Sequence, residues 1–192
     1  EWYPCRSVRI NIRKYLSETK VPNLPKTIVY SLVHNTQMDK ELRLKIKEIA
    51  EEFSKLKGFE WEYDIFSDFE RSIWLCVHDD NQLVAVTKMI KYVGGIESQF
   101  TVWNYHNPKL SLGKKIVYFE IDAASGVLDT KDYLYIGQGY ERGSVYKTSF
   151  AGFEWWTGEE WSTDRAEYER LCHRDSSINT LKELARVYKG KD

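Results

Sequence analysis

A chain of 192 residues is long enough to bury one hydrophobic core, and a formal net charge of −1 at pH 7 excludes an overall electrostatic preference for nucleic acids or membranes. Hydrophobic residues make up 42% of the chain and aromatic residues 15%, which excludes an intrinsically disordered protein. The three cysteines are far apart and form no C-x-x-C pair: Cys5, Cys76 and Cys172. They support neither a zinc knuckle nor a disulfide framework, and they predict reduced, mostly buried thiols in a cytoplasmic protein.

The sequence gives no signal for a membrane or a metal. Its apolar runs are shorter than the ~20 residues that a membrane-spanning helix needs, and its pattern predicts no signal peptide. The four histidines lie in separate segments without a metal-binding spacing, so we expect no metal partner. The chain begins at Glu1 without methionine, which indicates that an upstream segment was removed or not expressed.

The first half of the chain predicts two strands and one amphipathic helix. Residues 7–13 alternate between apolar and polar side chains, as a half-buried strand does, and residues 26–35 predict a second strand. Over residues 38–58 apolar side chains recur at three- and four-residue steps, which predicts a helix closed by Gly58. Six basic residues against one acid between positions 6 and 26 fit either an anion-facing edge or, more commonly, a solvated strand face.

The second half predicts a hairpin, a β-α-β unit and two terminal helices. The hairpin covers residues 71–93 and turns at residues 79–82. The β-α-β unit, with a parallel pairing of its strands, comprises a strand at 96–107, a helix at 111–126 and a strand at 132–139. The two helices cover residues 162–175 and 176–189. The predicted fold class is α/β, a bent mixed sheet covered by helices.

The segment NPKLSLGKKI (107–116) is the first candidate for binding chemistry. A strand stops at Pro108, and a helix begins near Ser111 or Leu112. The first amide groups of a helix lack partners and carry partial positive charge, so a phosphate there gains about 1 kcal/mol from the helix dipole. Three lysines flank the position: Lys109, Lys114 and Lys115. The commoner alternative is an ordinary capped helix with solvent-exposed lysines.

The second candidate is YLYIGQGYERGSVYKTSF (133–150). Gly137 and Gly139 allow the chain to bulge where a ligand approaches the backbone closely. Two phenols and a cation follow within one loop's length: Tyr140, Tyr146 and Lys147. A phenol returns a proton to a leaving group, and a lysine binds phosphate or carboxylate. A glycine-rich turn with packed tyrosines is the equally frequent alternative.

The third candidate, FEWWTGEEW (153–161), alternates tryptophans with glutamates. One interpretation is an aromatic platform that recognises a cationic substrate. The other, more frequent one is a seal between the core and the helical tail.

The first two segments together resemble the GNAT fold of N-acyltransferases. In the GNAT loop pattern Arg/Gln-x-x-Gly-x-Gly/Ala, the corresponding residues are Pro108, Ser111 and Gly113, of which only Gly113 matches. A closer resemblance is to the GNAT-like C-terminal domain of arginyl-tRNA–protein transferases, over residues 96–156. The matching motifs are Ser111-Leu112-Gly113, Glu120-Ile121-Asp122-Ala123, Tyr133-Leu134-Tyr135-Ile136-Gly137, Gly143-Ser144, Tyr146-Lys147-Thr148-Ser149-Phe150 and Glu154. The paired cysteines of the transferases' N-terminal domain have no counterpart in this chain.

The resemblance implies a GNAT-like bent sheet with a central β-α-β unit, over residues 1–157. A C-terminal helical extension of residues 158–192 would pack on the same domain. The implied activity is the transfer of an aminoacyl group from tRNA to an amine of a protein or a small acceptor, with aminoacyl-tRNA as co-substrate and no other cofactor. Two alternatives stay open: a GNAT N-acyltransferase that uses acyl-CoA, and a non-catalytic GNAT-like binding protein.

The resemblance also implies roles for individual residues. The carrier's phosphate or terminal ribose would be held by Ser111, Leu112, Gly113 and Lys114, with support from Lys147. Tyr140 or Tyr146 would donate a proton, and the candidate bases are Glu120 and Asp122. Glu154 would orient the amine or pair with Lys147.

Overall fold

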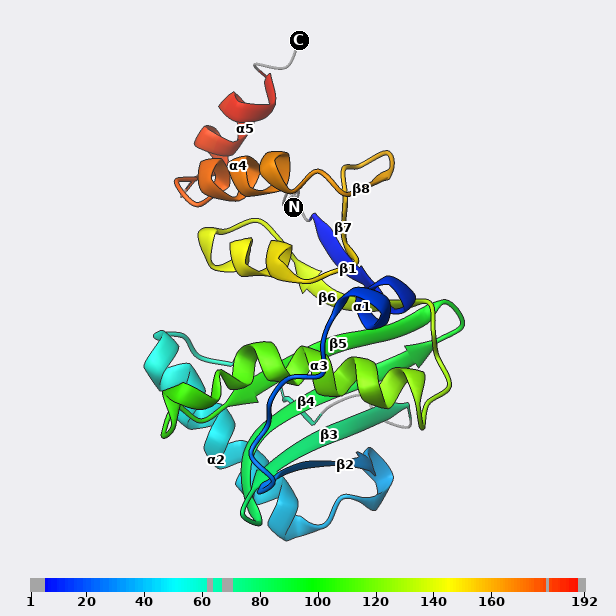
Figure 1. The fold of residues 1–192 in the computed structure, drawn as a ribbon. Helices are drawn as coiled ribbons and strands as arrows, with labels where there is room; N and C mark the ends of the chain where they lie inside the picture. Colours follow the sequence, from blue (N-terminus) through cyan, green and yellow to red (C-terminus); the bar gives the residue numbers. More distant parts are fainter. Residues whose placement is uncertain (1–5, 62–63, 67–70, 179, 190–192) are drawn as a thin grey trace. The chain divides into compact units, whose positions relative to one another are not determined.

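The computed structural model describes residues 6–61, 64–66, 71–178 and 180–189 (Figure 1). The chain divides into two compact units. The central unit is Thr19–Leu134, and the terminal unit combines Glu1–Glu18 with Tyr135–Asp192. Both units contain strands and helices, so the predicted mixed α/β class is confirmed. In the described part of the chain, no helix is both long enough and apolar enough to cross a bilayer.

The described part of the central unit is built on four strands that are hydrogen-bonded in the order β2-β3-β4-β5, with every neighbouring pair antiparallel. Its strands are β2 (Ile28–His34), β3 (Ser72–Asp79), β4 (Gln82–Tyr92) and β5 (Gly95–Trp103). Its helices are α2 (Lys40–Lys57) and α3 (Leu112–Ser125), and its 3-10 turns are η1 (Asn35–Gln37) and η2 (Pro108–Leu110). All six predicted strands and helices of this region are therefore confirmed, although β5 ends at Trp103 instead of residue 107.

The ends of these elements follow from local chemistry. The Asp39 side chain accepts a hydrogen bond from the Leu42 amide and starts α2, and Gly58 ends this helix in the left-handed conformation at φ 74°. The tight turn between β3 and β4 is made by Asp80 and Asn81, both with positive φ. Aspartate and asparagine tolerate this conformation better than other non-glycine residues, so the hairpin prediction is confirmed for the expected reason.

Helices α2 and α3 cover opposite faces of the central sheet. Val86 packs with Ile46 in the cluster on the α2 side, whereas the neighbouring Thr87 contacts Glu120 on α3. Successive side chains of a strand point to opposite faces, so these two contacts place the helices on different sides. Figure 1 shows α3 running across β4 and β5.

A β-bulge interrupts the pairing of β4 with β5. Lys88 pairs with Phe100 and Met89 pairs with Ser98, so that Gln99 is the extra residue on β5. In a regular strand, Ser98 and Thr101 would point to opposite faces because they are three positions apart. The bulge removes this mismatch and turns both hydroxyls toward α3, where their oxygens lie 3.1 Å apart.

The described residues of the terminal unit form four short strands and three helices. The strands are β1 (Ser7–Asn11), β6 (Tyr133–Gln138, in this unit from Tyr135), β7 (Phe153–Trp156) and β8 (Trp161–Ser162), in the order β6-β1-β7-β8. The helices are α1 (Ile12–Glu18), α4 (Arg165–Asp175) and α5 (Leu181–Lys189), with a 3-10 segment η3 (Arg142–Ser149). The pairs β1–β7 and β7–β8 are antiparallel.

Two sequence predictions in the terminal unit are wrong in part. The strand predicted over residues 7–13 ends at Asn11, because the Asn11 side chain accepts from the Lys14 amide and starts α1. In α1, Ile12 and Tyr15 are buried on one face. The predicted loop after β6 is largely the 3-10 segment η3.

The terminal helices begin later than predicted, whereas the prediction of buried, free thiols is confirmed for the cysteines that the structure describes. Asp164 caps α4 by accepting from the Glu167 amide, so this helix starts at Arg165 and not at residue 162. Cys76 and Cys172 are free and buried, as predicted, whereas Cys5 lies outside the described residues. The division at residue 157 stays a prediction.

Candidate functional site

The start of α3 offers a small number of free amide groups. Pro108 has no N–H, the Leu110 amide donates to the Asn107 carbonyl at 3.1 Å, and the Ser111 amide donates to the Pro108 carbonyl at 3.2 Å. Ser111 itself is left-handed (φ 50°, ψ 46°), and its side chain makes no capping hydrogen bond. Within the described residues, the first amides that donate to no backbone carbonyl therefore belong to residues 112 and 113.

Three lysines are close in sequence to these two amides. Lys109 and Lys114 are exposed and Lys115 is half-buried. Two amides at a helix start together with exposed ammonium groups suit one phosphate group. The arrangement provides fewer donors than a pyrophosphate requires.

Gly113 has a packing role that the sequence did not reveal. A Cβ atom at this position would lie 2.9 Å from Cζ2 of the Trp103 indole. The Trp103 ring in turn packs edge-on against Phe53 of α2 at a centroid distance of 4.9 Å. Close packing therefore explains the glycine by itself, and a contact between Gly113 and a carrier stays a prediction.

Glu120 points into the molecule. Its side chain is 1% exposed and faces the central sheet, whereas Asp122 on the same helix is exposed and accepts a hydrogen bond from the Tyr30 hydroxyl at 2.6 Å. Of the two candidate bases, only Glu120 is enclosed by protein. A fully buried carboxyl group is costly unless it is protonated or hydrogen-bonded, so its partners matter.

Three hydroxyl groups accompany the Glu120 carboxyl group. Thr87 on β4 donates to Glu120 Oε1 at 2.8 Å, and Ser98 on β5 also bonds to this carboxyl group. The Thr87 oxygen lies 3.1 Å from that of Ser98 and 2.9 Å from that of Thr101. We call these four residues the carboxyl–hydroxyl cluster: Thr87, Ser98, Thr101 and Glu120. Ser98 and Thr101 are half-buried, so the cluster extends from the interior toward solvent.

Burial raises the pKa of Glu120 from 4.5 to about 7, although the hydrogen bonds from Ser98 and Thr87 act to lower it. A carboxyl group that titrates near neutral pH can both accept and return a proton under physiological conditions. Sequence reasoning named Glu120 but missed the hydroxyls of Thr87, Ser98 and Thr101. Their grouping depends on the β5 bulge, which the sequence pattern does not predict.

Lys147 in the terminal unit is a buried amine. Its side chain is enclosed, with the residue 8% exposed, and Nζ donates to the Gln138 carbonyl at 2.7 Å. Burial lowers the pKa of Lys147 to about 8, against the effect of Cys172 and Glu141, which raise it. The Lys147 amine thus meets the backbone at the end of β6, and its predicted support of a carrier anion stays a prediction.

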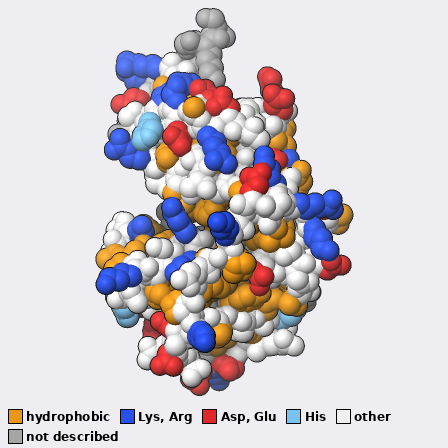
Figure 2. Space-filling view, in the orientation of Figure 1, with side chains coloured by type: hydrophobic (Ala, Val, Ile, Leu, Met, Phe, Trp, Pro, Cys, Tyr) orange, Lys and Arg blue, Asp and Glu red, His pale blue; other side chains and the backbone are white. Residues whose placement is uncertain are grey.

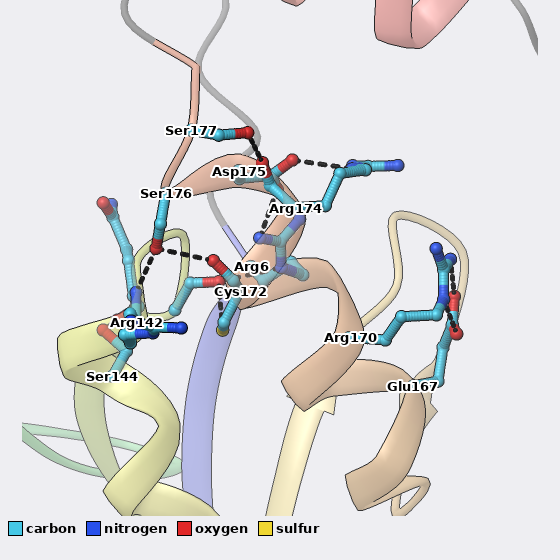
Figure 3. Close-up of polar contacts among 12 residues, drawn as sticks. Arg6, Arg142, Ser144, Glu167, Arg170, Cys172, Arg174, Asp175, Ser176 and Ser177 are labelled. Carbon is cyan, nitrogen blue, oxygen red and sulfur yellow. Dashed lines mark hydrogen bonds and ion pairs between the residues drawn. The ribbon is translucent and has the colours of Figure 1, made fainter.

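Gly139 makes room for a helix side chain. A Cβ atom at Gly139 would lie 1.8 Å from the Tyr168 hydroxyl oxygen of α4. The Gly139 carbonyl also accepts from Arg6 Nε at 2.8 Å and from the Cys172 thiol at 3.4 Å. Figure 3 shows Arg6 and Cys172 side by side, with Asp175 as the second partner of Arg6. Gly139 is therefore explained by internal packing, and the approach of a ligand to this loop stays a prediction.

Glu154 pairs with Arg9 instead of Lys147. Arg9 Nε lies 2.7 Å from Glu154 Oε2, across the β1–β7 pair, and the Arg9 guanidinium stacks on Trp161 at 3.8 Å from the ring centroid. The cation-binding face that the tryptophan-rich segment offers at Trp161 is thus occupied from within. Trp155 is buried and packs against Tyr168, which agrees with the interpretation of this segment as a seal.

The two tyrosines named as proton donors are both exposed, Tyr140 by 40% and Tyr146 by 45%. The Tyr146 ring packs edge-on against Phe150 at a centroid distance of 6.0 Å. The structure therefore brings the predicted residues together in two groups. One lies on α3 of the central unit and the other follows β6 in the terminal unit. Among the described residues, no group of three or more metal-binding side chains is present.

Comparisons with known proteins show similarity of fold without similarity of sequence. No protein-family model and no curated protein matches the sequence. L-PGS from Bacillus licheniformis matches in structure with a TM-score of 0.52 and 11% identity, over 87% of this chain and 57% of its own. The chain is thus similar in fold to L-PGS.

Two further solved structures match with TM-scores of 0.49. One is the C-terminal domain (DUF2156) of a putative lysylphosphatidylglycerol synthetase from Agrobacterium fabrum, at 7% identity over 70% of this chain and 46% of its own. The other is a GCN5-related N-acetyltransferase from Kribbella flavida, at 15% identity over 70% and 48%. The chain spans about half the length of these solved structures.

Proposed function

We propose that the chain is a GNAT-like acyltransferase that transfers an aminoacyl group from aminoacyl-tRNA to an amine of a protein or a small molecule. The observation that carries the proposal is the position of Glu120, a buried carboxyl group with a pKa near 7 on the helix whose first amides are free. The likeness in fold to L-PGS from Bacillus licheniformis supports the proposal.

Helix α3 connects the two parts of this chemistry. Glu120 lies eight residues beyond Leu112, so the anion-binding end and the carboxyl group are about 12 Å apart along the helix axis. Attack of an amine on an ester needs an unprotonated nitrogen that is aligned with the carbonyl carbon. A phosphate anchored at the helix start would hold the donor, and Glu120 would take up the proton that the amine loses.

The free amides favour the end of a tRNA over coenzyme A. Only residues 112 and 113 offer unoccupied amides at this helix start, within the described chain, and they suit a single phosphate. A pyrophosphate, such as that of coenzyme A, is normally held by a longer series of backbone amides. An acyl-CoA donor is therefore the less favoured alternative, which the experiment below distinguishes.

The distribution of charge suggests a limited contact with tRNA. Figure 2 shows basic side chains scattered among acidic and hydrophobic ones on the face that it draws, without a continuous basic stripe. Of the basic residues between positions 6 and 26, Arg6 pairs with Asp175 and Arg9 with Glu154. We therefore expect contact with a few phosphates near the aminoacylated end, since each phosphate contact usually needs a lysine or an arginine.

Ligand-dependent thermal stability tests the proposal. The ligands are aminoacylated tRNA, uncharged tRNA, acetyl-CoA and coenzyme A, and the variants are Lys109→Ala, Lys114→Ala and, as a control, the exposed Lys131→Ala. A ligand at 100 times its Kd stabilises the folded protein by about 2.7 kcal/mol. We expect a salt-sensitive stabilisation by aminoacylated tRNA that both test variants reduce and Lys131→Ala retains.

The other outcomes separate the alternatives. Stabilisation by acetyl-CoA and coenzyme A without an effect of tRNA would replace the tRNA donor with acyl-CoA. No stabilisation by any of the four ligands would contradict an acyltransferase function and favour a non-catalytic binding protein.

A further inference from the structure

The carboxyl–hydroxyl cluster forms a connected chain of hydrogen bonds. It starts in the interior at Glu120, which bonds to the hydroxyls of Thr87 and Ser98, and Thr87 in turn bonds to Thr101. Thr87 is buried, whereas Ser98 and Thr101 are half-buried residues. The hydrogen bonds of Thr87 in this chain are between 2.8 and 3.1 Å. Hydroxyl groups both donate and accept, so such a chain can pass a proton along its length.

We propose that this cluster is a proton relay, in which Ser98 or Thr101 takes the proton that leaves the amine. From Thr101 the proton reaches Glu120 through Thr87, and from Ser98 it reaches Glu120 directly or through Thr87. The proposal rests on the acyl transfer proposed above for the identity of the proton donor. Glu120 does not contact the amine in this arrangement, and it acts through the hydroxyl groups. The end of the relay is on β5, where the bulge at Gln99 turns both hydroxyls to the same face.

Among the described residues, Glu120 has no charged partner. Around it, β3 contributes the buried Leu75, and β4 contributes Thr87, flanked by the apolar Ala85 and Met89. The charged and titratable side chains of the packed elements have other partners. Lys88 reaches the Ile65 carbonyl, Lys91 reaches the Leu128 carbonyl, Glu97 accepts from Tyr92, and Asp122 accepts from Tyr30. Burial and hydrogen bonds from Thr87 and Ser98 therefore control the titration of Glu120.

The proton transfers balance. As the amine nitrogen bonds to the ester carbonyl carbon, its proton moves to the Ser98 or Thr101 oxygen. Thr101 passes its own proton to Thr87, which passes its proton to the Glu120 carboxylate, whereas Ser98 passes its proton to the carboxylate directly or through Thr87. The carboxylate becomes a neutral acid. The ester oxygen leaves with a proton that returns along the same route, so the hydroxyls and the Glu120 carboxylate are regenerated.

Two measurements on the same variants test the relay. Infrared titration follows the carbonyl stretch of protonated Glu120, and a pH profile follows transfer from aminoacylated tRNA to a peptide with a free N-terminus. Thr87→Val removes one hydrogen bond to the carboxylate, so the titration midpoint of Glu120 and the acidic limb of the rate profile should both move to higher pH. The maximal rate should also fall, because Thr101 loses its hydrogen-bonded route to Glu120. Thr87→Ser keeps the hydroxyl and should restore both.

Glu120→Gln should lower the rate by about 100-fold or more, which is the usual contribution of a general base, and should remove the acidic limb. The control Asp129→Asn changes an exposed carboxyl group beyond α3, at a left-handed position that asparagine tolerates, and should leave both measurements unchanged. Thr101→Val, at a half-buried position, provides a second variant of the relay if Thr87→Val folds poorly.

Three results would overturn the relay. The first is a full rate in Glu120→Gln. The second is a shift of the infrared midpoint in Thr87→Val without a matching shift of the rate profile, which would leave the cluster a purely structural role. The third is a wild-type protein that transfers nothing from either aminoacyl-tRNA or acyl-CoA. That last result also contradicts the proposed function, whereas the first two contradict the relay alone.

Discussion

At the scale of single residues, two glycines have functions that differ from those their sequence context suggests. Gly139 precedes the exposed Tyr140, yet its missing side chain accommodates the Tyr168 hydroxyl of α4. Gly113 matches the last glycine of the GNAT loop pattern, yet the Trp103 ring occupies the space of its Cβ atom. A glycine beside a candidate ligand site therefore identifies a close approach without identifying what approaches.

Replacement of Gly139 tests this packing. Gly139→Ala places a methyl group 1.8 Å from the Tyr168 oxygen, so α4 or the chain around residue 139 must move. Overpacking of this kind costs about 3 kcal/mol. We expect that loss in urea unfolding, whereas the control Gly94→Ala, which meets no atom within 4 Å, should change stability little. Equal stability of the two variants would contradict the close contact.

Glu120 should make stability depend on pH. Its pKa in the folded protein is about 7 and its ordinary value is 4.5, so the folded state retains a proton that the unfolded state loses between these values. Stability from this group is complete below pH 4.5 and is lost as the pH rises through 7, to a total of about 3 kcal/mol.

The comparison of wild type with Glu120→Gln isolates this effect, since the amide does not titrate. Urea unfolding at several pH values between 4 and 8 should show the wild type losing about 3 kcal/mol relative to the variant. A constant difference across this range would show that Glu120 titrates at its ordinary pKa.

At the scale of elements, α4 is fixed to the terminal unit by a buried ion pair. Arg6 and Asp175 have side-chain exposures of only 7% and 3%, and Asp175 also accepts from Arg174 at 2.8 Å. On the same helix, Glu167 and Arg170 form an exposed pair at 2.7 Å (Figure 3). One helix thus carries a buried and an exposed ion pair.

The two pairs should contribute very differently to stability. Asp175→Asn leaves the Arg6 charge buried without its counter-ion, which costs about 3 kcal/mol, whereas Glu167→Gln removes an exposed pair worth less than about 1 kcal/mol. Hydrogen exchange of the α4 amides should therefore accelerate strongly in Asp175→Asn and little in Glu167→Gln. Similar rates in the two variants would show that Arg6 does not anchor this helix.

At the scale of the whole molecule, the features that could be predicted are those set by residues close together in the sequence. The period of α2, its Gly58 stop and the Asp80–Asn81 turn are all local signals, and each of them is confirmed. The start of α1 was missed because the alternating pattern continues to residue 13, whereas the Asn11 side chain caps a helix that starts directly after Asn11. The partner of Glu154 was missed because it depends on the pairing of β1 with β7, which lie far apart in the sequence.

The candidate site shows the same limit. The sequence named Glu120 but left its orientation open, because α3 is apolar on most of its surface and its inner face is poorly defined. The burial of Lys147 was not predicted, since its position depends on the fold of η3 against the end of β6. The hydroxyl partners of Glu120 required the register of β4 with β5, which includes the bulge.

The bulge in β5 also bears on how this strand tolerates changes in length. Loss of a residue elsewhere in a strand turns the following side chains to the opposite face of the sheet. Loss of Gln99 would instead leave Phe100 directly after Ser98, with both still on the faces that they occupy now. Position 99 is thus the place where β5 can shorten by one residue and keep its inward-facing hydroxyls, so related sequences can differ in length here without rebuilding the interior.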